Sequence, residues 1–393
     1  MPALVLMTTA GFAGYALLLT VAPLWAVHGG ASTAGSGLVN GVLLLFTVLT
    51  QLLVPRALRA FGWGPVLAVG LVLLGVPGAL YSVSDVLGVV LALSAVRGIG
   101  FGVLTVTGSA AVAALVGQRR RGEAIGAYGL AVALPNLVLL PGGPWIAETV
   151  GYWAVFTLSA LPLVGIPAAL RLASALRRSA PDLRRGQFAA HDPADSESAA
   201  YRRLVRPMLL LLVVTLAGGA VITFTPQMVD STLVAAGGLF LMGLSAALSR
   251  WRAGVLADRH GPQRFLVPLV PLTGVGMALV SWSVADLDGV RVGSFLAAMV
   301  LIGLCYGALQ NLTLLISFTA VSRRHHNLAS AVWNVGFDAG TALGSVAVGV
   351  IAELTSFAAA FLLAGVVAVA TLPLALLRPA DVATRSEASR SVE

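Results

Sequence analysis

Residues 254–264 read Gly254-Val255-Leu256-Ala257-Asp258-Arg259-His260-Gly261-Pro262-Gln263-Arg264, a short polar turn between two long apolar runs at 233–253 and 264–284. Gly254 permits the close approach of two helices, and Asp258 can accept backbone N–H groups or pair with a nearby arginine. We therefore expect a conformational latch, and the alternative is a tight solvated turn. The expected latch residues are Gly254, Asp258, Arg259, Gly261 and Arg264.

The two flanking runs belong to a pattern that covers the chain. The 393 residues are 58% hydrophobic and 10% charged, whereas soluble domains carry about 25% charged residues. A membrane-spanning helix needs about 20 predominantly apolar residues. Twelve such runs occur, at 3–27, 36–57, 65–84, 86–116, 124–147, 153–175, 207–229, 233–253, 264–284, 292–318, 328–352 and 357–377. We expect an all-α integral membrane protein with twelve transmembrane helices.

The charges between the runs alternate in sign. The chain has no lysine, and 22 of its 24 arginines lie in every second break, which include the stretch 176–206, and in the C-terminal tail. The other breaks contain Asp85, Glu148, Asp230, Asp286, Asp288, Glu353 and a single arginine, Arg291. Because arginine-rich loops remain in the cytoplasm, we expect a multi-pass protein of the bacterial cytoplasmic (inner) membrane with both termini cytoplasmic.

The polar stretch 176–206 divides the chain into two similar halves. We expect an N-terminal six-helix bundle at 1–175, a cytoplasmic linker at 176–206, a C-terminal six-helix bundle at 207–378 and a cytoplasmic tail at 379–393. At an offset of 205 residues, Ile146-Ala147-Glu148 matches Ile351-Ala352-Glu353. Since six spans are an even number, the halves have the same orientation and form a parallel pseudo-repeat about the membrane normal.

Two charged residues fall well inside apolar runs, where charge is costly and marks function. Asp338 shares a helical face with Asn334, Thr341 and Ser345. A desolvated carboxyl group there can take up and release a proton, so we expect Asp338 to carry the coupling proton. Arg97 either modulates Asp338 or anchors an anionic group of the substrate. The alternative for both is a fixed ion pair, or an arginine that caps backbone carbonyls.

The sequence resembles the major facilitator superfamily over nearly its whole length. Residues 254–264 match the family's loop signature G-x-L-A-D-R-x-G-x-x-R, although the first-half copy has Arg59 in place of the acid. Arg97-Gly98-Ile99-Gly100-Phe101-Gly102 is similar to the family's fourth-helix motif, which is associated with proton coupling. Gly142-Gly143-Pro144 preserves part of the antiporter motif. Within the family, the chain resembles the drug/sugar proton antiporter type.

This resemblance implies a central site between the bundles and transport by alternating access. Neutral polar residues in helices that line the cavity in this family are candidates for the site, or alternatively hydrogen-bond one helix to another. These candidates are Tyr15, Asn40, Asn136, Thr223, Gln227, Gln310, Asn311, Trp333 and Asn334.

Several function classes are disfavoured. Because the chain has no lysine, it lacks the P-loop lysine that binds the phosphates of ATP, and we do not expect transport driven by ATP hydrolysis. No Cys/His cluster has the spacing of metal ligands. The arginines are not interleaved with aromatic residues as in nucleic-acid-binding faces. We expect a monomeric secondary transporter without a cofactor, whose partners are a small molecule, protons and the bilayer. Proton-coupled efflux is the favoured function. The alternatives are proton-coupled uptake, a polytopic membrane enzyme acting on lipid, and a receptor or assembly subunit that does not transport.

Overall fold

The computed structural model describes residues 1–115, 121–183, 197–286, 289–322 and 325–377. The side chains of 113–126, 178–183, Asp258 and Asn327 lie outside this description. The part described is helical, and twelve of its helical segments are long and apolar enough to cross a membrane. The expected all-α, twelve-span membrane protein is confirmed.

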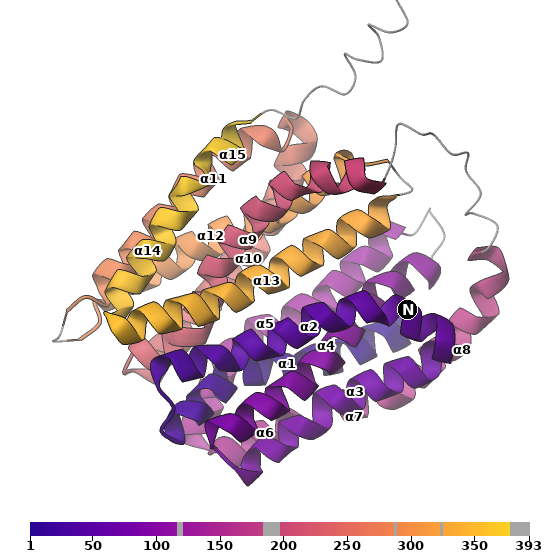
Figure 1. The fold of residues 1–393 in the computed structure, drawn as a ribbon, viewed down its shortest axis with the longest axis horizontal. Helices are drawn as coiled ribbons and strands as arrows, with labels where there is room; N and C mark the ends of the chain where they lie inside the picture. The colour runs from indigo at the N-terminus through magenta and orange to yellow at the C-terminus, as the bar shows by residue number, and fades with distance from the viewer. Residues whose placement is uncertain (116–120, 184–196, 287–288, 323–324, 378–393) are drawn as a thin grey trace, which may run out of the picture.

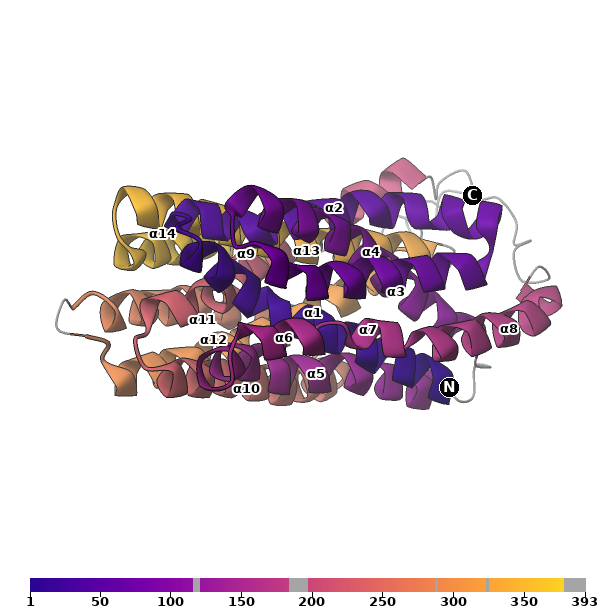
Figure 2. The same ribbon diagram turned by 90° about the horizontal axis from the view of Figure 1, so that it is seen from below.

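The N-terminal half contains α1 (Pro2–His28), α2 (Thr33–Phe61), α3 (Trp63–Leu80), the 3₁₀ turn η1 (Tyr81–Val83), α4 (Leu87–Leu115), α5 (Arg121–Thr149), α6 (Tyr152–Leu158), α7 (Leu161–Val164) and α8 (Ile166–Leu183). The C-terminal half contains α9 (Glu197–Met228), α10 (Thr232–His260), α11 (Gln263–Ser283), α12 (Val292–Thr319), α13 (His326–Leu354), α14 (Phe357–Ala370) and α15 (Leu372–Leu376). Figures 1 and 2 show that the long helices lie roughly along one direction.

The last span of each half is interrupted, although each was predicted as one run. The sixth span divides into α6, α7 and α8 near Pro162 and Pro167, and the twelfth divides into α14 and α15 next to Pro373. Proline lacks the backbone N–H of the helical ladder and its ring clashes with the preceding turn. Proline alone does not fix where a helix breaks, since Pro23 in α1, Pro135 in α5 and Pro268 in α11 lie within continuous helices.

The linker predicted at 176–206 is partly helical. The helix α8 continues to Leu183, and α9 begins at Glu197, ten residues before the predicted span. An acidic residue in the first turn is favourable beside the positive end of the helix dipole. Residues 184–196 and the predicted tail at 379–393 lie outside the described residues, so these domain boundaries stay a prediction.

The two halves repeat the same packing. In the N-terminal half α1 packs on α5, while α4 packs on α2 and α3. In the C-terminal half α9 packs on α13, while α12 packs on α10 and α11. The equivalent helices α2 and α10 both end at a glycine with positive φ, Gly62 at 77° and Gly261 at 78°, a conformation that glycine adopts without steric cost.

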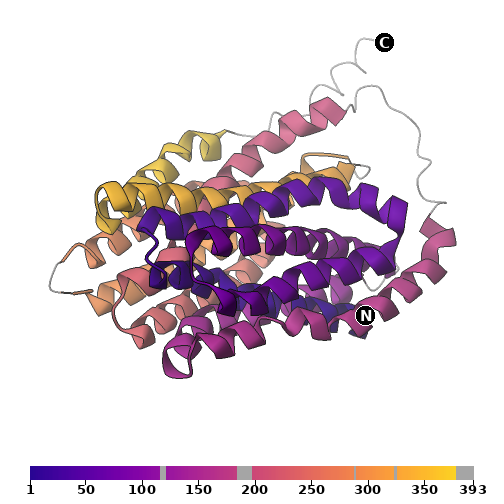
Figure 3. The ribbon, with the colours of Figure 1, turned by 60° about the horizontal axis from the view of Figure 1, so that its bottom comes forward.

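Two helix pairs form most of the contact between the halves. The helix α2 runs alongside α13, as Figures 1 and 3 show, and α5 packs on α10. These pairs are equivalent under the pseudo-repeat. Gly37 of α2 lies against the Ser345 carbonyl of α13, and Gly243 of α10 lies against Leu137 of α5. Small residues thus let the helices approach closely.

The ends of the bundle differ in charge. One end carries Asp85, Glu148 and Glu353, at or beside the ends of α3, α5 and α13, and we call it the acidic end. The other end, where α1 begins and α2 ends, carries Arg56 and Arg59, and we call it the arginine-rich end.

Candidate functional site

Asp338 is the buried carboxylate at the interface between the halves. It lies near the middle of α13 and is 3% exposed. The Nε2 amide of Gln51 on α2 donates a hydrogen bond of 2.6 Å to its Oδ2. The same amide lies 3.2 Å from the Thr105 hydroxyl of α4. Asp338 is thus held by a donor from the opposite half.

Arg97 is fully buried within the N-terminal half. Its Nη1 lies 3.5 Å from the Tyr81 hydroxyl, which in turn is 2.7 Å from Ser94 Oγ. Its Nε and Nη2 have no hydrogen-bond partner in the described protein. At 1.5 Å per residue, Arg97 lies about 15 Å from the acidic end along α4, whereas Asp338 lies about 24 Å from that end along α13. Within the described residues the two charges form no ion pair.

Tyr15 lies in the same region as both charges. Its ring stacks on Phe101 of α4 with centroids 3.7 Å apart. It is buried, and it lies close enough to both Asp338 and Arg97 to interact electrostatically with each. The predicted residues Tyr15, Arg97 and Asp338 therefore belong to one central region.

A hydrogen-bonded network joins the two halves at a level nearer to the acidic end than Asp338. Asn40 Nδ2 donates to Leu19 O (2.8 Å) and Thr223 Oγ1 (3.0 Å), and Thr223 Oγ1 lies 2.8 Å from Ser345 Oγ. Ser36 Oγ donates to Gln227 Oε1 at 3.0 Å. These contacts bring together three of the predicted cavity residues, Asn40, Thr223 and Gln227. Ser36, which belongs to the same network, was not among the predicted residues.

The last interhalf hydrogen bond lies at the acidic end itself. Glu353 Oε2 accepts the Ala34 backbone N–H at 2.7 Å, beside the Ser32 N-cap of α2. Within the described part of the chain, every hydrogen bond between the halves uses a residue of α2 or its N-cap: Ser32, Ala34, Ser36, Asn40 or Gln51. The contact between α5 and α10 has none there.

The remaining predicted residues lie elsewhere. Asn136 and Asn334 donate to carbonyls of their own helices, Val132 O and Ser330 O, each at 2.8 Å. Trp333 Nε1 donates to Thr313 Oγ1 at 3.2 Å inside the C-terminal half. Gln310 is buried, and its Nε2 has no partner in the described protein.

The turn at 254–264 is anchored within its own half. Gly254 packs against Asn311, whose Nδ2 donates to Arg250 O at 2.8 Å, so Asn311 holds α12 to α10. Gln263 Oε1 accepts from Arg206 Nη2 at 2.7 Å. Arg259 and Arg264 are exposed. The side chain of Asp258 lies outside the described residues, so the latch stays a prediction.

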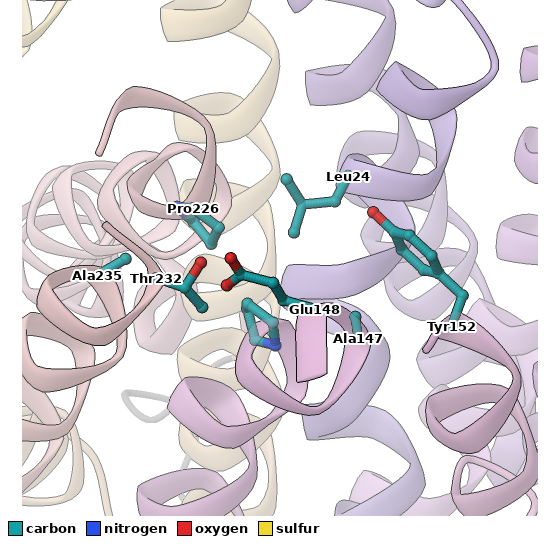
Figure 4. Close-up of a pocket in the computed structure, with 8 residues that line it drawn as sticks. Leu24, Ala147, Glu148, Tyr152, Pro226, Thr232 and Ala235 are labelled. Carbon is teal, nitrogen blue, oxygen red and sulfur yellow. The ribbon is translucent and has the colours of Figure 1, made fainter. Parts of the chain in front are cut away.

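A cavity of about 300 Å³ opens between α5 and α10 at the acidic end. Figure 4 shows the Glu148 carboxylate and the Thr232 hydroxyl facing the same space. The lining residues are Leu24, Pro144, Ala147, Glu148, Tyr152, Pro226, Thr232 and Ala235. Sequence reasoning assigned no role to this place.

The central region contains a buried acid, a buried base and several polar atoms without partners. Besides Arg97, these atoms include Gln51 Oε1 and Gln310 Nε2; Asn40 Oδ1, in the network nearer the acidic end, also has no partner in the described protein. Buried polar atoms without a hydrogen-bond partner are rare and costly in proteins. A polar solute bound in the central region would supply partners for these atoms. Among the described residues, no group of three His, Cys, Asp or Glu side chains can hold a metal ion.

Twelve spans in two repeated bundles, with ionisable residues at depth, define a multi-pass transporter. Comparison with known proteins agrees, because the profile of the Major Facilitator Superfamily matches residues 4–318 and 232–393. The chain belongs to this superfamily. It is 22% identical to the staphylopine export protein of Staphylococcus aureus (strain Mu50 / ATCC 700699), over 95% of each chain. The crystal structure of a point mutant of the nucleoside transporter NupG superposes with a TM-score of 0.70 at 12% identity, over 95% of this chain and 98% of that chain.

Proposed function

We propose that this transporter exports a small organic solute across a bacterial cytoplasmic membrane in exchange for protons, by alternating access. The observation that carries the proposal is the hydrogen bond from Gln51 to Asp338, because it places a buried ionisable group on the surface where the two halves must separate. We assign the acidic end to the outside and the arginine-rich end to the cytoplasm, following the distribution of arginine.

Asp338 supplies the proton-dependent step in this proposal. An ionised carboxylate away from water needs hydrogen-bond donors, and Gln51 supplies one while α2 and α13 are together. Protonation removes the charge and weakens the need for that donor, so the halves separate at lower cost. Proton binding at one carboxyl group thereby biases which end is open.

Arg97 anchors an anionic group of the solute or modulates Asp338 through the central region. The absence of an ion pair between the two, within the described residues, and the free Nε and Nη2 support the anchor role. Those two N–H groups lie on one edge of a planar guanidinium, the arrangement that binds a carboxylate or phosphate through two parallel hydrogen bonds.

Export is favoured over uptake by the relative named as an export protein. Proton-coupled uptake on the same fold is the alternative. Because the chain belongs to a transporter family, a membrane enzyme acting on lipid is no longer an alternative. If the protein were a receptor that does not transport, substitution of Asp338 would change no solute flux. The monomeric state stays a prediction.

The direction can be tested in proteoliposomes with one protein orientation. A thermal-shift screen first identifies a solute that stabilises the native state by mass action. A pH gradient, acidic on the side of the acidic end, should then drive solute toward that side in antiport and away from it in symport. Movement with the protons would refute export. If Asp338→Asn transported as the wild type does under the gradient, the proposed proton carrier would be wrong.

A further inference from the structure

We propose that the cavity between α5 and α10 at the acidic end binds a small organic cation, with Glu148 as its counter-ion. This site is separate from the central region, and it concerns a different ligand from the exported solute. The pseudo-repeat, the lining of the cavity and the charge at this end support the site.

The pseudo-repeat shows what is unusual about Glu148. Its equivalent in the second half is Glu353, within the shared Ile-Ala-Glu triplet. Glu353 is engaged, because it accepts the Ala34 N–H at the start of α2. The equivalent place for Glu148 is the start of α10, which Ser231 caps in the same way as Ser32 caps α2. Within the described part of the chain Glu148 makes no hydrogen bond or ion pair.

The space beside Glu148 is shaped for a small molecule. It is bounded by both halves, with Leu24, Ala147 and Tyr152 on one side and Pro226 and Ala235 on the other. Its volume of about 300 Å³ is at the lower end of the range of small-molecule pockets. Apart from Glu148, Thr232 and the Tyr152 hydroxyl, the lining side chains are apolar. A ligand there must combine a compact apolar body with one polar group.

The charge selects a cation. A carboxylate in a partly apolar cavity attracts an ammonium group. Asp230 lies two residues before Thr232, and Asp85 and Glu353 add negative charge to the same end. Clefts of one charge sign concentrate the opposite ion. A substituted ammonium ion of one aromatic ring or less meets these requirements.

Binding can be measured by isothermal titration of purified protein in nanodiscs with benzyltrimethylammonium. We expect saturable binding to the wild type and none with benzenesulfonate, which has the same ring and the opposite charge. Glu148→Gln should weaken binding of the cation at least tenfold, and Glu148→Asp should weaken it less than threefold because the charge is kept. Glu148 is exposed, so these variants are expected to fold.

Two matched variants locate the site. Asp85→Asn and Asp286→Asn each remove a carboxylate of the acidic end that is held within its own half, by His28 and Arg291 respectively; each should leave the dissociation constant of benzyltrimethylammonium within about twofold of the wild type. The proposal is overturned if the wild type does not bind the cation, if Glu148→Gln binds it as the wild type does, or if Asp85→Asn or Asp286→Asn weakens binding as much as Glu148→Gln does. The last result would assign the attraction to the charge of the whole acidic end and leave proton-coupled export untouched.

Discussion

Replacing Gln51 by leucine should destabilise the protein in a pH-dependent way. The substitution keeps the bulk of a buried side chain and removes the 2.6 Å donor to Asp338. A hydrogen bond to a charged group contributes about 1.5–3 kcal/mol. With an unfolding entropy of about 2.1 cal per mol per K per residue, that loss lowers the melting temperature of this chain by about 2–4 °C.

The pH dependence follows from the charge state of Asp338. The donor stabilises the ionised carboxylate, so its loss matters at a pH where Asp338 is charged and matters little where Asp338 is protonated in both proteins. We expect the melting temperatures of Gln51→Leu and wild type to converge at acidic pH and to diverge as the pH rises. Thermal unfolding in nanodiscs across pH 5–9 measures the difference.

Two controls separate this effect from general damage. Thr105→Val removes the other contact of the Gln51 amide, a neutral one at 3.2 Å, and should produce a shift that does not depend on pH. In an Asp338→Asn background, Gln51→Leu should lose most of its effect at high pH, which is the coupling expected in a double-mutant cycle. An equal shift at every pH, or additive effects of the two substitutions, would show that Gln51 does not act through the charge of Asp338.

Three further predictions concern the interface and Arg97. The first uses a Cys305→Ala background, which removes the single, buried cysteine, and places a new cysteine at Ser36. Adding Glu353→Gln should speed maleimide labelling of this cysteine, because the carboxylate no longer holds the start of α2. An unchanged labelling rate would show that this contact does not keep the acidic end closed. Gly37→Val should raise the rate of amide hydrogen exchange in α2 and α13, because the valine side chain would meet the Ser345 carbonyl. The control Gly88→Val should leave this rate unchanged, since there is open space around Gly88. Equal exchange rates in the two variants would show that close packing at Gly37 does not hold the two helices together. Arg97→Lys should weaken the binding of a solute that carries a carboxylate or phosphate at least tenfold, because lysine lacks the planar pair of donors; an unchanged dissociation constant would remove Arg97 as an anchor.

The membrane fold could be predicted from the sequence because charge is so sparse in it. The apolar runs and the alternating arginines indicated twelve spans, and the Ile-Ala-Glu triplet indicated the repeat. The breaks in the sixth and twelfth spans at Pro162, Pro167 and Pro373 were missed, because hydropathy reports how apolar a segment is and carries no information on its backbone hydrogen bonds.

The site was only partly predictable. Arg97 and Asp338 stood out as charges within apolar runs, and they are the charged residues that the described structure buries. Gln51 was missed, since its partner is 287 residues away and a neutral amide in a membrane helix has many structural uses. Asn311 was placed in the cavity by family resemblance, yet it holds α12 to α10. Which face a polar residue presents depends on packing that one sequence does not reveal.

The role of Asp338 as proton carrier is tested most directly by solute-induced proton movement in proteoliposomes loaded with a pH-sensitive dye. With a solute found by thermal shift, the wild type should move protons when solute is added on one side. Asp338→Asn should still exchange solute for solute, which shows that it is folded and can alternate between its states, but it should move no protons. Proton movement by Asp338→Asn at the wild-type rate would show that Asp338 is not the proton carrier.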